Sequence, residues 1–101
     1  MKRYKVYTLE KGIVETDKYN VFKYLTWHRE DGPAVNCYYN NGLIEFVEYW
    51  VNGQLHRLDG PAIIGYDING NITNIEYCIN DKEYTKEQYD NELLKLKVQS
   101  L

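Results

Sequence analysis

The sequence predicts a mostly β protein: an antiparallel β-meander of stacked repeated hairpins with one C-terminal α-helix. The first observation behind this prediction is a repeated heptapeptide, since HREDGPA at 28–34 returns as HRLDGPA at 56–62. A fixed period, here 28 residues, is typical of repeat architectures. The second observation is a change of pattern after residue 84, where helical spacing of apolar residues replaces strands and turns.

The composition favours one folded, soluble domain, 1–101, because 44% of the residues are hydrophobic and 27% are charged. The net charge of −3 and the absence of any run of more than two Lys or Arg argue against nucleic-acid binding. No stretch approaches the roughly 20 apolar residues of a membrane helix, and Met1 is followed by Lys2 and Arg3. We therefore expect a cytoplasmic protein with no membrane partner.

The 28-residue offset extends beyond the heptapeptide. Asn41 and Gly42 fall on Asn69 and Gly70, and the Val-Asn-Gly at 51–53 falls on Ile-Asn-Asp at 79–81. Four segments follow from this alignment: a degenerate first repeat or cap at 1–26, repeat one at 27–53, repeat two at 54–84 and a capping helix at 85–101.

Each repeat is predicted to contain one hairpin and to end in a second hairpin that joins it to the next segment. Asn-Gly between β-rich runs favours a type I′ turn, in which both central residues have positive φ. It predicts strands at 35–40 and 43–51 in repeat one, and at 63–68 and 72–79 in repeat two. Asn52 and Gly53 predict a further hairpin that joins the units, and the Asn-Asp at 80–81 is its weaker counterpart.

The heptapeptide itself has the residues of a rigid bend that starts a strand. Gly32 permits unusual backbone angles, and Pro33 fixes φ. Asp31 can accept hydrogen bonds from backbone amides two residues on, and Arg29 can pair with the same carboxylate. The structural turn in both copies therefore comprises Asp31, Gly32, Pro33, Asp59, Gly60 and Pro61.

The N-terminal segment has similar β character without the heptapeptide. Alternation over residues 4–8 predicts a strand, and Lys11 with Gly12 predicts a turn. Residues 19–27 resemble another outgoing strand, in which Phe22 falls on Trp50 at the 28-residue offset. We expect this unit to act as a cap, because terminal repeats are usually atypical.

The C-terminal segment predicts a helix over 86–98. Thr85 and Gln88 have the spacing of a capping box, in which each residue pairs with the other's backbone N–H. Leucines and Tyr89 follow at near-helical spacing. We expect this apolar stripe to cover the last edge strand, because an uncovered edge invites aggregation.

The tandem HRxDGPA motif, followed by a strand that ends in Tyr-Trp-Val-Asn-Gly, resembles a family of small repeat proteins related to MORN repeats. Members of this family occur in giant viruses, phages and some bacteria. The resemblance covers residues 27–84 and implies an antiparallel meander of hairpins, in a viral or phage protein. Cys78 and Asp81 replace the aromatic residue and glycine that the family pattern has there, so we expect an irregular last hairpin.

The sequence does not favour an enzyme or a metal protein. Cys37 and Cys78 lie inside predicted strands and are expected to be inert, free thiols, and no nucleophile–base pair is evident. His28 and His56 could join the heptapeptide aspartates at a metal, but stacked units would need the same ligands twice. We predict no catalytic residues, no metal and no cofactor.

Aromatic residues on the strands are the main functional clue. Neighbours such as Tyr49 and Trp50 point to opposite faces of a sheet, so both faces carry rings. Tyr, Trp and Arg are enriched in binding hot spots. The candidate binding residues are Trp27, His28, Arg29, Tyr38, Tyr49, Trp50, His56, Arg57, Tyr66 and Tyr77.

These residues favour a non-enzymatic protein-binding module. If the protein is viral, as the resemblance implies, its partner would be a host factor. One alternative is a protein that binds or sequesters a small, nucleotide-like ligand, with Arg29 and Arg57 on its phosphates. Another is a structural, self-associating repeat protein that forms a homodimer through an exposed edge strand.

Overall fold

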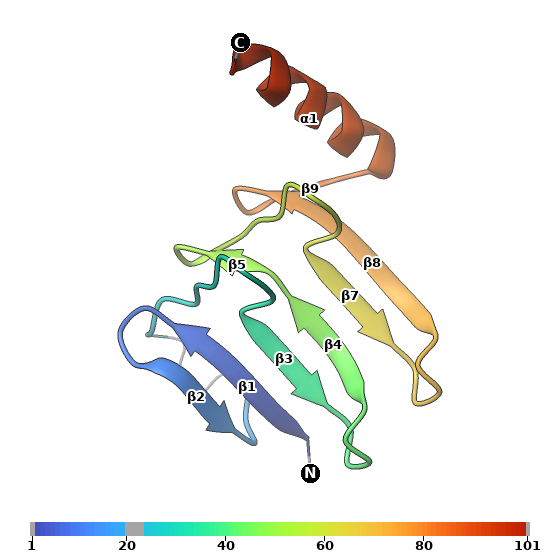
Figure 1. Cartoon of the computed structure of the whole chain (residues 1–101). Coiled ribbons are helices and arrows are strands. Elements are labelled where there is room, and N and C mark those ends of the chain that lie inside the picture. The colour runs from blue at the N-terminus through green and yellow to red at the C-terminus, as the bar shows by residue number, and fades with distance from the viewer. Residues whose placement is uncertain (1, 20–23, 101) are drawn as a thin grey trace.

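The structure, a computed structural model, describes residues 2–19 and 24–100. It confirms a mostly antiparallel β-meander with one C-terminal helix. The main sheet has the strand order β2-β1-β3-β4-β7-β8-β9, and β5 and β6 form a separate two-stranded sheet (Figure 1). The elements are β1 (Arg3–Thr8), β2 (Gly12–Thr16), β3 (Val35–Tyr38), β4 (Ile44–Glu48), β5 (Trp50–Val51), β6 (Gln54–Leu55), β7 (Ile63–Tyr66), β8 (Ile72–Ile79), β9 (Lys82–Tyr84) and α1 (Lys86–Gln99).

The seven strands form a single layer, and the helix extends from its C-terminal end (Figure 1). The molecule is accordingly thin, with extents of 46 × 34 × 19 Å. Its core is an aromatic cluster on one face of the sheet, where Trp27 and Trp50 meet edge-on with ring centres 5.1 Å apart. The cluster comprises Val6, Trp27 and Val35, with Tyr4, Tyr19, Phe46 and Trp50 packed against them.

The Asn-Gly turns within each repeat differ from the prediction. Gly42 and Gly70 both have φ of 86°, but the asparagines before them do not have positive φ, so the type I′ prediction is wrong here. Gly42 N–H donates to Tyr39 C=O (2.9 Å) and Tyr39 N–H donates to Leu43 C=O (2.8 Å). This pattern is a three-residue loop with glycine in the left-handed region. The longer loop explains why β3 ends earlier and β4 begins later than predicted. The predicted strand 43–51 is also divided at Tyr49 into β4 and β5.

The hairpins at the ends of the repeats do have two successive residues with positive φ. The values are 50° and 79° at Asn52 and Gly53, and 48° and 72° at Asn80 and Asp81. The last hairpin therefore has the same backbone as the one before it, and the irregularity that the family pattern implied is not seen. The Asp81 carboxylate also accepts the Leu55 N–H at 3.1 Å, which is a contact that glycine could not make.

The residues of the first unit that correspond to those of the repeats are identified by their equivalent hydrogen bonds, because the 28-residue offset does not extend to this unit. His28 N–H donates to Tyr7 C=O and His56 N–H donates to Tyr49 C=O, both at 3.0 Å. Tyr7 thus takes the place of Tyr49 at an offset of 42 residues, which makes β1 the outgoing strand of this unit. The strand predicted at 19–27 is wrong for residues 19 and 24–27, which belong to no strand, and Phe22 lies outside the described residues.

The longer offset comes from the loop that follows β1. The Thr8–Trp27 bridge corresponds to the Trp50–Leu55 pair, but 18 residues, 9–26, connect the first pair where four, 51–54, connect the second. Part of the longer connection forms β2, which pairs with β1 from Tyr4–Thr16 to Thr8–Gly12. The insertion therefore adds an edge strand to the sheet.

Helix α1 begins where the sequence predicts but packs differently. Both hydrogen bonds of the capping box between Thr85 and Gln88 are present. Tyr89 is the buried residue of the helix, whereas the side chains of Leu94 and Val98 are 61% and 67% exposed. The helix points away from the sheet (Figure 1). The prediction that its apolar stripe covers the last edge is therefore wrong. Within the described residues, no helix is both long and apolar enough to span a membrane.

Candidate functional site

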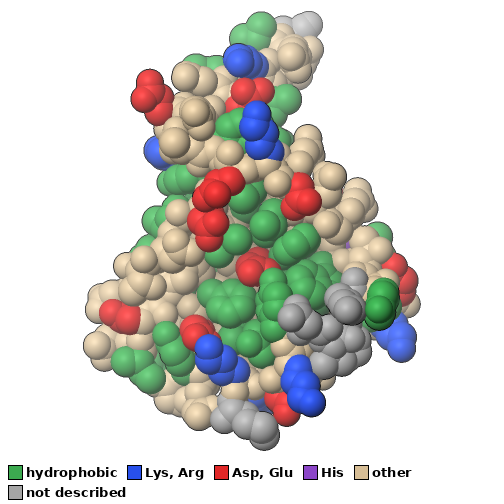
Figure 2. Space-filling view, turned by 180° about the vertical axis from the view of Figure 1, so that it is seen from behind, with side chains coloured by type: hydrophobic (Ala, Val, Ile, Leu, Met, Phe, Trp, Pro, Cys, Tyr) green, Lys and Arg blue, Asp and Glu red, His purple; other side chains and the backbone are tan. Residues whose placement is uncertain are grey.

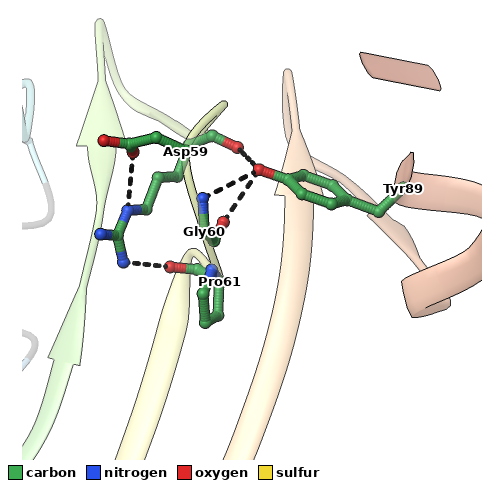
Figure 3. Close-up of polar contacts among 5 residues, drawn as sticks. Asp59, Gly60, Pro61 and Tyr89 are labelled. Carbon is green, nitrogen blue, oxygen red and sulfur yellow. Dashed lines mark hydrogen bonds and ion pairs between the residues drawn. The ribbon is translucent and has the colours of Figure 1, made fainter. Parts of the chain in front are cut away.

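The heptapeptide forms a bend held together by its arginine. Arg57 Nε donates to Asp59 Oδ1 at 2.9 Å, and Nη1 donates to the C=O of Pro61 at 3.0 Å (Figure 3). The guanidinium also lies over the ring of Tyr49, 4.0 Å from its centre. The first copy repeats all three contacts, from Arg29 to Asp31, Pro33 and Tyr7. The predicted Arg–Asp pair thus stabilises the bend, and each arginine joins it to the preceding strand.

The glycine and aspartate of the bend act differently from the prediction. A Cβ on Gly32 would lie 2.9 Å from Arg29 Cζ, so a larger residue would have to displace the guanidinium that packs across this position. Gly32 has no positive φ, whereas Gly60 has φ of 153°. The predicted hydrogen bond from an amide two residues on to Asp31 is also wrong, because that residue is Pro33, which has no N–H.

Each heptapeptide histidine ties the start of its repeat to the turn at the end of the same repeat. His28 Nδ1 accepts the N–H of Asn52 at 2.9 Å, and His56 Nδ1 accepts the N–H of Asn80 at 3.0 Å. Each imidazole therefore fixes the first residue of the next left-handed turn. Over residues 2–19 and 24–100, no group of three His, Cys, Asp or Glu side chains is placed to hold a metal ion.

A hollow of about 410 Å³ lies between the two bends, where a small ligand would contact both arginines. Its lining includes Arg29, Asp31, Tyr49, His56, Arg57 and Asp59. Each guanidinium already pairs with its own aspartate at 2.8–2.9 Å, and a bound phosphate would compete with both carboxylates. This geometry does not favour the nucleotide-like ligand.

The ten candidate binding residues do not form one site. Trp27 and Trp50 belong to the aromatic cluster, and Arg29, Tyr49, His56 and Arg57 line the hollow. Tyr77 packs on Tyr89 with ring centres 4.8 Å apart, and His28 holds a turn. Tyr38 lines a separate hollow beside Arg3 and Glu15, and the C=O of Tyr66 accepts the hydroxyl of Tyr39. Replacement of Arg57 would therefore disturb the bend before it tested binding.

A more distinctive arrangement lies on the face of the sheet that carries the aromatic cluster. The strand register aligns Val35, Glu48, Ile63 and Glu76 in one row across β3, β4, β7 and β8. We define the open face as Phe46, Glu48, Ile63 and Glu76, which share this side by strand alternation, together with Trp50, which packs against the same cluster. Figure 2 shows hydrophobic side chains gathered over the middle of one face, with acidic side chains among them.

Glu48 is an unusual member of the open face because it is only 9% exposed. Its Oε1 accepts the Trp50 indole N–H and the Tyr19 hydroxyl, both at 2.9 Å. Burial raises the pKa of Glu48, and nearby Glu76 raises it further despite these hydrogen bonds. The alternation of Phe46, Glu48 and Trp50 in the sequence is a signal for this carboxylate, which is not among the ten candidate binding residues.

Replacement of Glu48 by glutamine is expected to stabilise the protein at neutral and higher pH. The folded-state pKa of Glu48 is raised, so its ionisation costs folding free energy as the pH rises through that value, and glutamine avoids this cost. The difference in urea midpoint between Glu48→Gln and the parent should be largest near pH 8 and shrink toward pH 4. Exposed Glu30→Gln is the control, and an equal pH dependence in both variants would contradict the assignment.

Both cysteines are buried, free thiols. Burial, with a contribution from Glu45, raises the pKa of Cys37 to about 12. Burial, with contributions from Glu83 and Glu76, raises the pKa of Cys78 to about 11. Since the thiolate is the nucleophile, neither side chain is activated for attack at neutral pH.

We therefore expect both thiols to resist an aromatic disulfide reagent at pH 8 while the protein is folded. A pKa near 12 leaves roughly one Cys37 thiol in ten thousand ionised at that pH. Two equivalents of reagent should react only after urea is added. Rapid release of the chromophore from the folded protein would contradict this expectation.

Comparisons with known proteins give no relative for this arrangement. No protein-family model matches the chain, and no curated protein and no solved structure matches it either. The resemblance to HRxDGPA repeat proteins therefore stays a prediction, and function must be argued from the geometry.

Proposed function

We propose that this protein is a non-enzymatic binding module that engages a protein partner through the open face. The observation that carries the proposal is a buried carboxylate, Glu48, beside Glu76 on the apolar side of a one-layer sheet. Trp50 and Ile63 on this face are half-buried, and they offer apolar area to a partner. The resemblance implies a host factor, whereas the geometry indicates the chemistry of the partner.

The charge of the open face favours a partner that presents a cation. Ionised Glu48 is disfavoured by burial and by Glu76, and an arginine placed between the two carboxylates would offset both effects. Its guanidinium could also stack on the indole of Trp50. We therefore infer a partner with an arginine or lysine surrounded by apolar residues, the composition of a binding hot spot.

Site-specific photo-crosslinking tests this proposal without knowing the partner. A photoreactive residue placed at Ile63 should form an adduct with a second polypeptide in cells, and Glu76→Lys should abolish it. The control position is Ile13 in β2, which is 54% exposed and points to the opposite face. Mass spectrometry should then place a basic residue of the partner near the crosslink.

Two results would overturn the proposal. Equal adducts from Ile63 and Ile13, or an adduct unaffected by Glu76→Lys, would show that the open face is not selective. An adduct of this chain with itself would favour the self-associating alternative.

A further inference from the structure

The outer edge of β8 is open over most of its length. Strand β9 pairs only with Tyr77, Cys78 and Ile79, from Tyr77–Tyr84 to Ile79–Lys82. Residues 72–76 pair with β7 on one side and have no strand on the other among the described residues. The chain then enters α1, which leads away from β8 (Figure 1).

In the preceding repeat, the equivalent strand edge is paired with another strand. Strand β4 lies 28 residues before β8, and its outer edge pairs with β7 through Val47–Ile64 and Glu48–Ile63. The Tyr49 N–H also donates to the C=O of Ala62 at 2.7 Å. The open edge at Ile75 and Glu76 is thus equivalent to the edge at Val47 and Glu48, which holds a strand within this molecule.

Replacement of a third heptapeptide by the helix explains why the edge stays open. Tyr84 occupies the register position of His56, so the chain turns into α1 where a third bend would begin. The Lys86 ammonium lies 5.5 Å from the centre of the Tyr77 ring, and the Tyr89 ring packs on it. Lys86 and Tyr89 thus cover the Tyr77 ring as Arg57 covers the Tyr49 ring, but the segment that carries them supplies no strand for the edge of β8.

Space and backbone groups for a strand are both present. A hollow of about 430 Å³ borders the edge and is lined in part by Ile75, Glu76, Tyr77 and Lys86. The Tyr49 N–H points toward β7, so the equivalent N–H of Tyr77 points to the outer side of β8, where Tyr84 of β9 already pairs with Tyr77. Backbone groups alternate along a strand, so the N–H and C=O of Ile75 also point outward.

We propose that the outer edge of β8 binds an extended segment of a protein partner as an added antiparallel strand. The internal occupant of the equivalent edge indicates its chemistry: β-branched residues such as Ile63 and Ile64, which would face Glu76 and Ile75. The segment must turn away at the position of Ala62, because Tyr84 already pairs with Tyr77 there. This inference is independent of the proposed function, because it concerns the sheet edge and not the open face.

The test uses a peptide copied from the segment that contains β7, which pairs with the equivalent edge of β4. A labelled peptide with the sequence of residues 60–67, GPAIIGYD, should bind the whole protein saturably in fluorescence anisotropy. Ile75→Pro should weaken binding about tenfold or more, because proline removes the outward N–H and its ring crowds the edge. Proline is tolerated on an edge strand where the N–H faces solvent, so β7 pairing should persist. Ile75→Thr retains the N–H and should bind like the parent.

A second arm keeps the test valid if Ile75→Pro fails to fold. In the peptide, proline at the position of Ile64 removes the N–H that would face Ile75, so this peptide should not bind the unaltered protein. Equal binding of both peptides, or no binding of GPAIIGYD at about 1 mM, would overturn the proposal.

Two controls separate this site from other interactions. Ile75 lies on the opposite face from Ile63, so Ile75→Pro should leave the crosslink at Ile63 intact. A second copy could also occupy the edge with β2, but that contact would not close and would build filaments. Growth of light scattering by the protein alone, abolished by Ile75→Pro, would assign the edge to self-assembly and overturn the proposal.

Discussion

Replacing Tyr89 with alanine is expected to release α1 from the sheet and to lower the free energy of unfolding by about 3–5 kcal/mol. Tyr89 is 2% exposed, and its ring packs on Tyr77. Among the described residues of the helix it is the one that is buried, so no other side chain compensates for its loss. Urea denaturation followed by far-UV circular dichroism measures the effect.

The hydroxyl of Tyr89 should contribute separately. It lies 2.7 Å from the C=O of Arg57 and 3.0 Å from the C=O of Gly60, and it accepts the Gly60 N–H at 3.2 Å (Figure 3). Tyr89→Phe leaves these groups of the bend without their partner, which should cost about 1–3 kcal/mol. The exposed helix variant Leu94→Ala should change stability by less than about 0.5 kcal/mol. A Tyr89→Ala protein that unfolds at the parent's urea concentration would contradict the docking role.

The start of α1 could be predicted from sequence, but its docking could not. The capping box is local, since Thr85 and Gln88 satisfy each other's backbone within one turn. Docking depends on the contact of Tyr89 with Gly60, 29 residues away, and no periodicity within the helix encodes that contact. The helical spacing of the leucines therefore predicts a packed stripe, although Leu94 and Leu96 are exposed in the structure.

The repeat shows the same division between local and distant information. The Arg–Asp pair and the turns of positive φ at Asn52 and Gly53 follow from residues close in sequence. The first unit was assigned to the wrong strand because a constant offset cannot detect the insertion after β1. The burial of Glu48 was also missed, because Tyr19, which covers it, comes from that insertion.

A common rule connects the units once the insertion is recognised. Each outgoing strand has a tyrosine at or next to its C-terminal end, and the following segment covers the ring of this tyrosine with a cation: Arg29 on Tyr7, Arg57 on Tyr49 and Lys86 on Tyr77. The glycine of each heptapeptide leaves room for the guanidinium of its arginine, Arg29 or Arg57. Substitution of that glycine therefore tests the contact that joins the units.

Gly60→Ala is expected to destabilise the protein by about 2–3 kcal/mol, more than either of two matched variants. Gly60 combines φ of 153° with a Cβ position 3.0 Å from Arg57 Cζ. Gly32 has the close contact without positive φ, so Gly32→Ala should cost about 1 kcal/mol as Arg29 shifts. Gly42 has φ of 86° with nothing within 4 Å of its Cβ position, so Gly42→Ala should cost about 1 kcal/mol from strain alone.

The three urea midpoints separate steric from backbone effects. If contact and strain both act at Gly60, its loss should exceed the loss at Gly32, which has the contact alone, and the loss at Gly42, which has positive φ alone. A second comparison isolates the guanidinium: in an Arg57→Ala background, Gly60→Ala should lose its steric part and keep its strain. An unchanged cost in that background would show that the arginine does not require glycine, and the proposed link between units would then rest on the tyrosine contact alone.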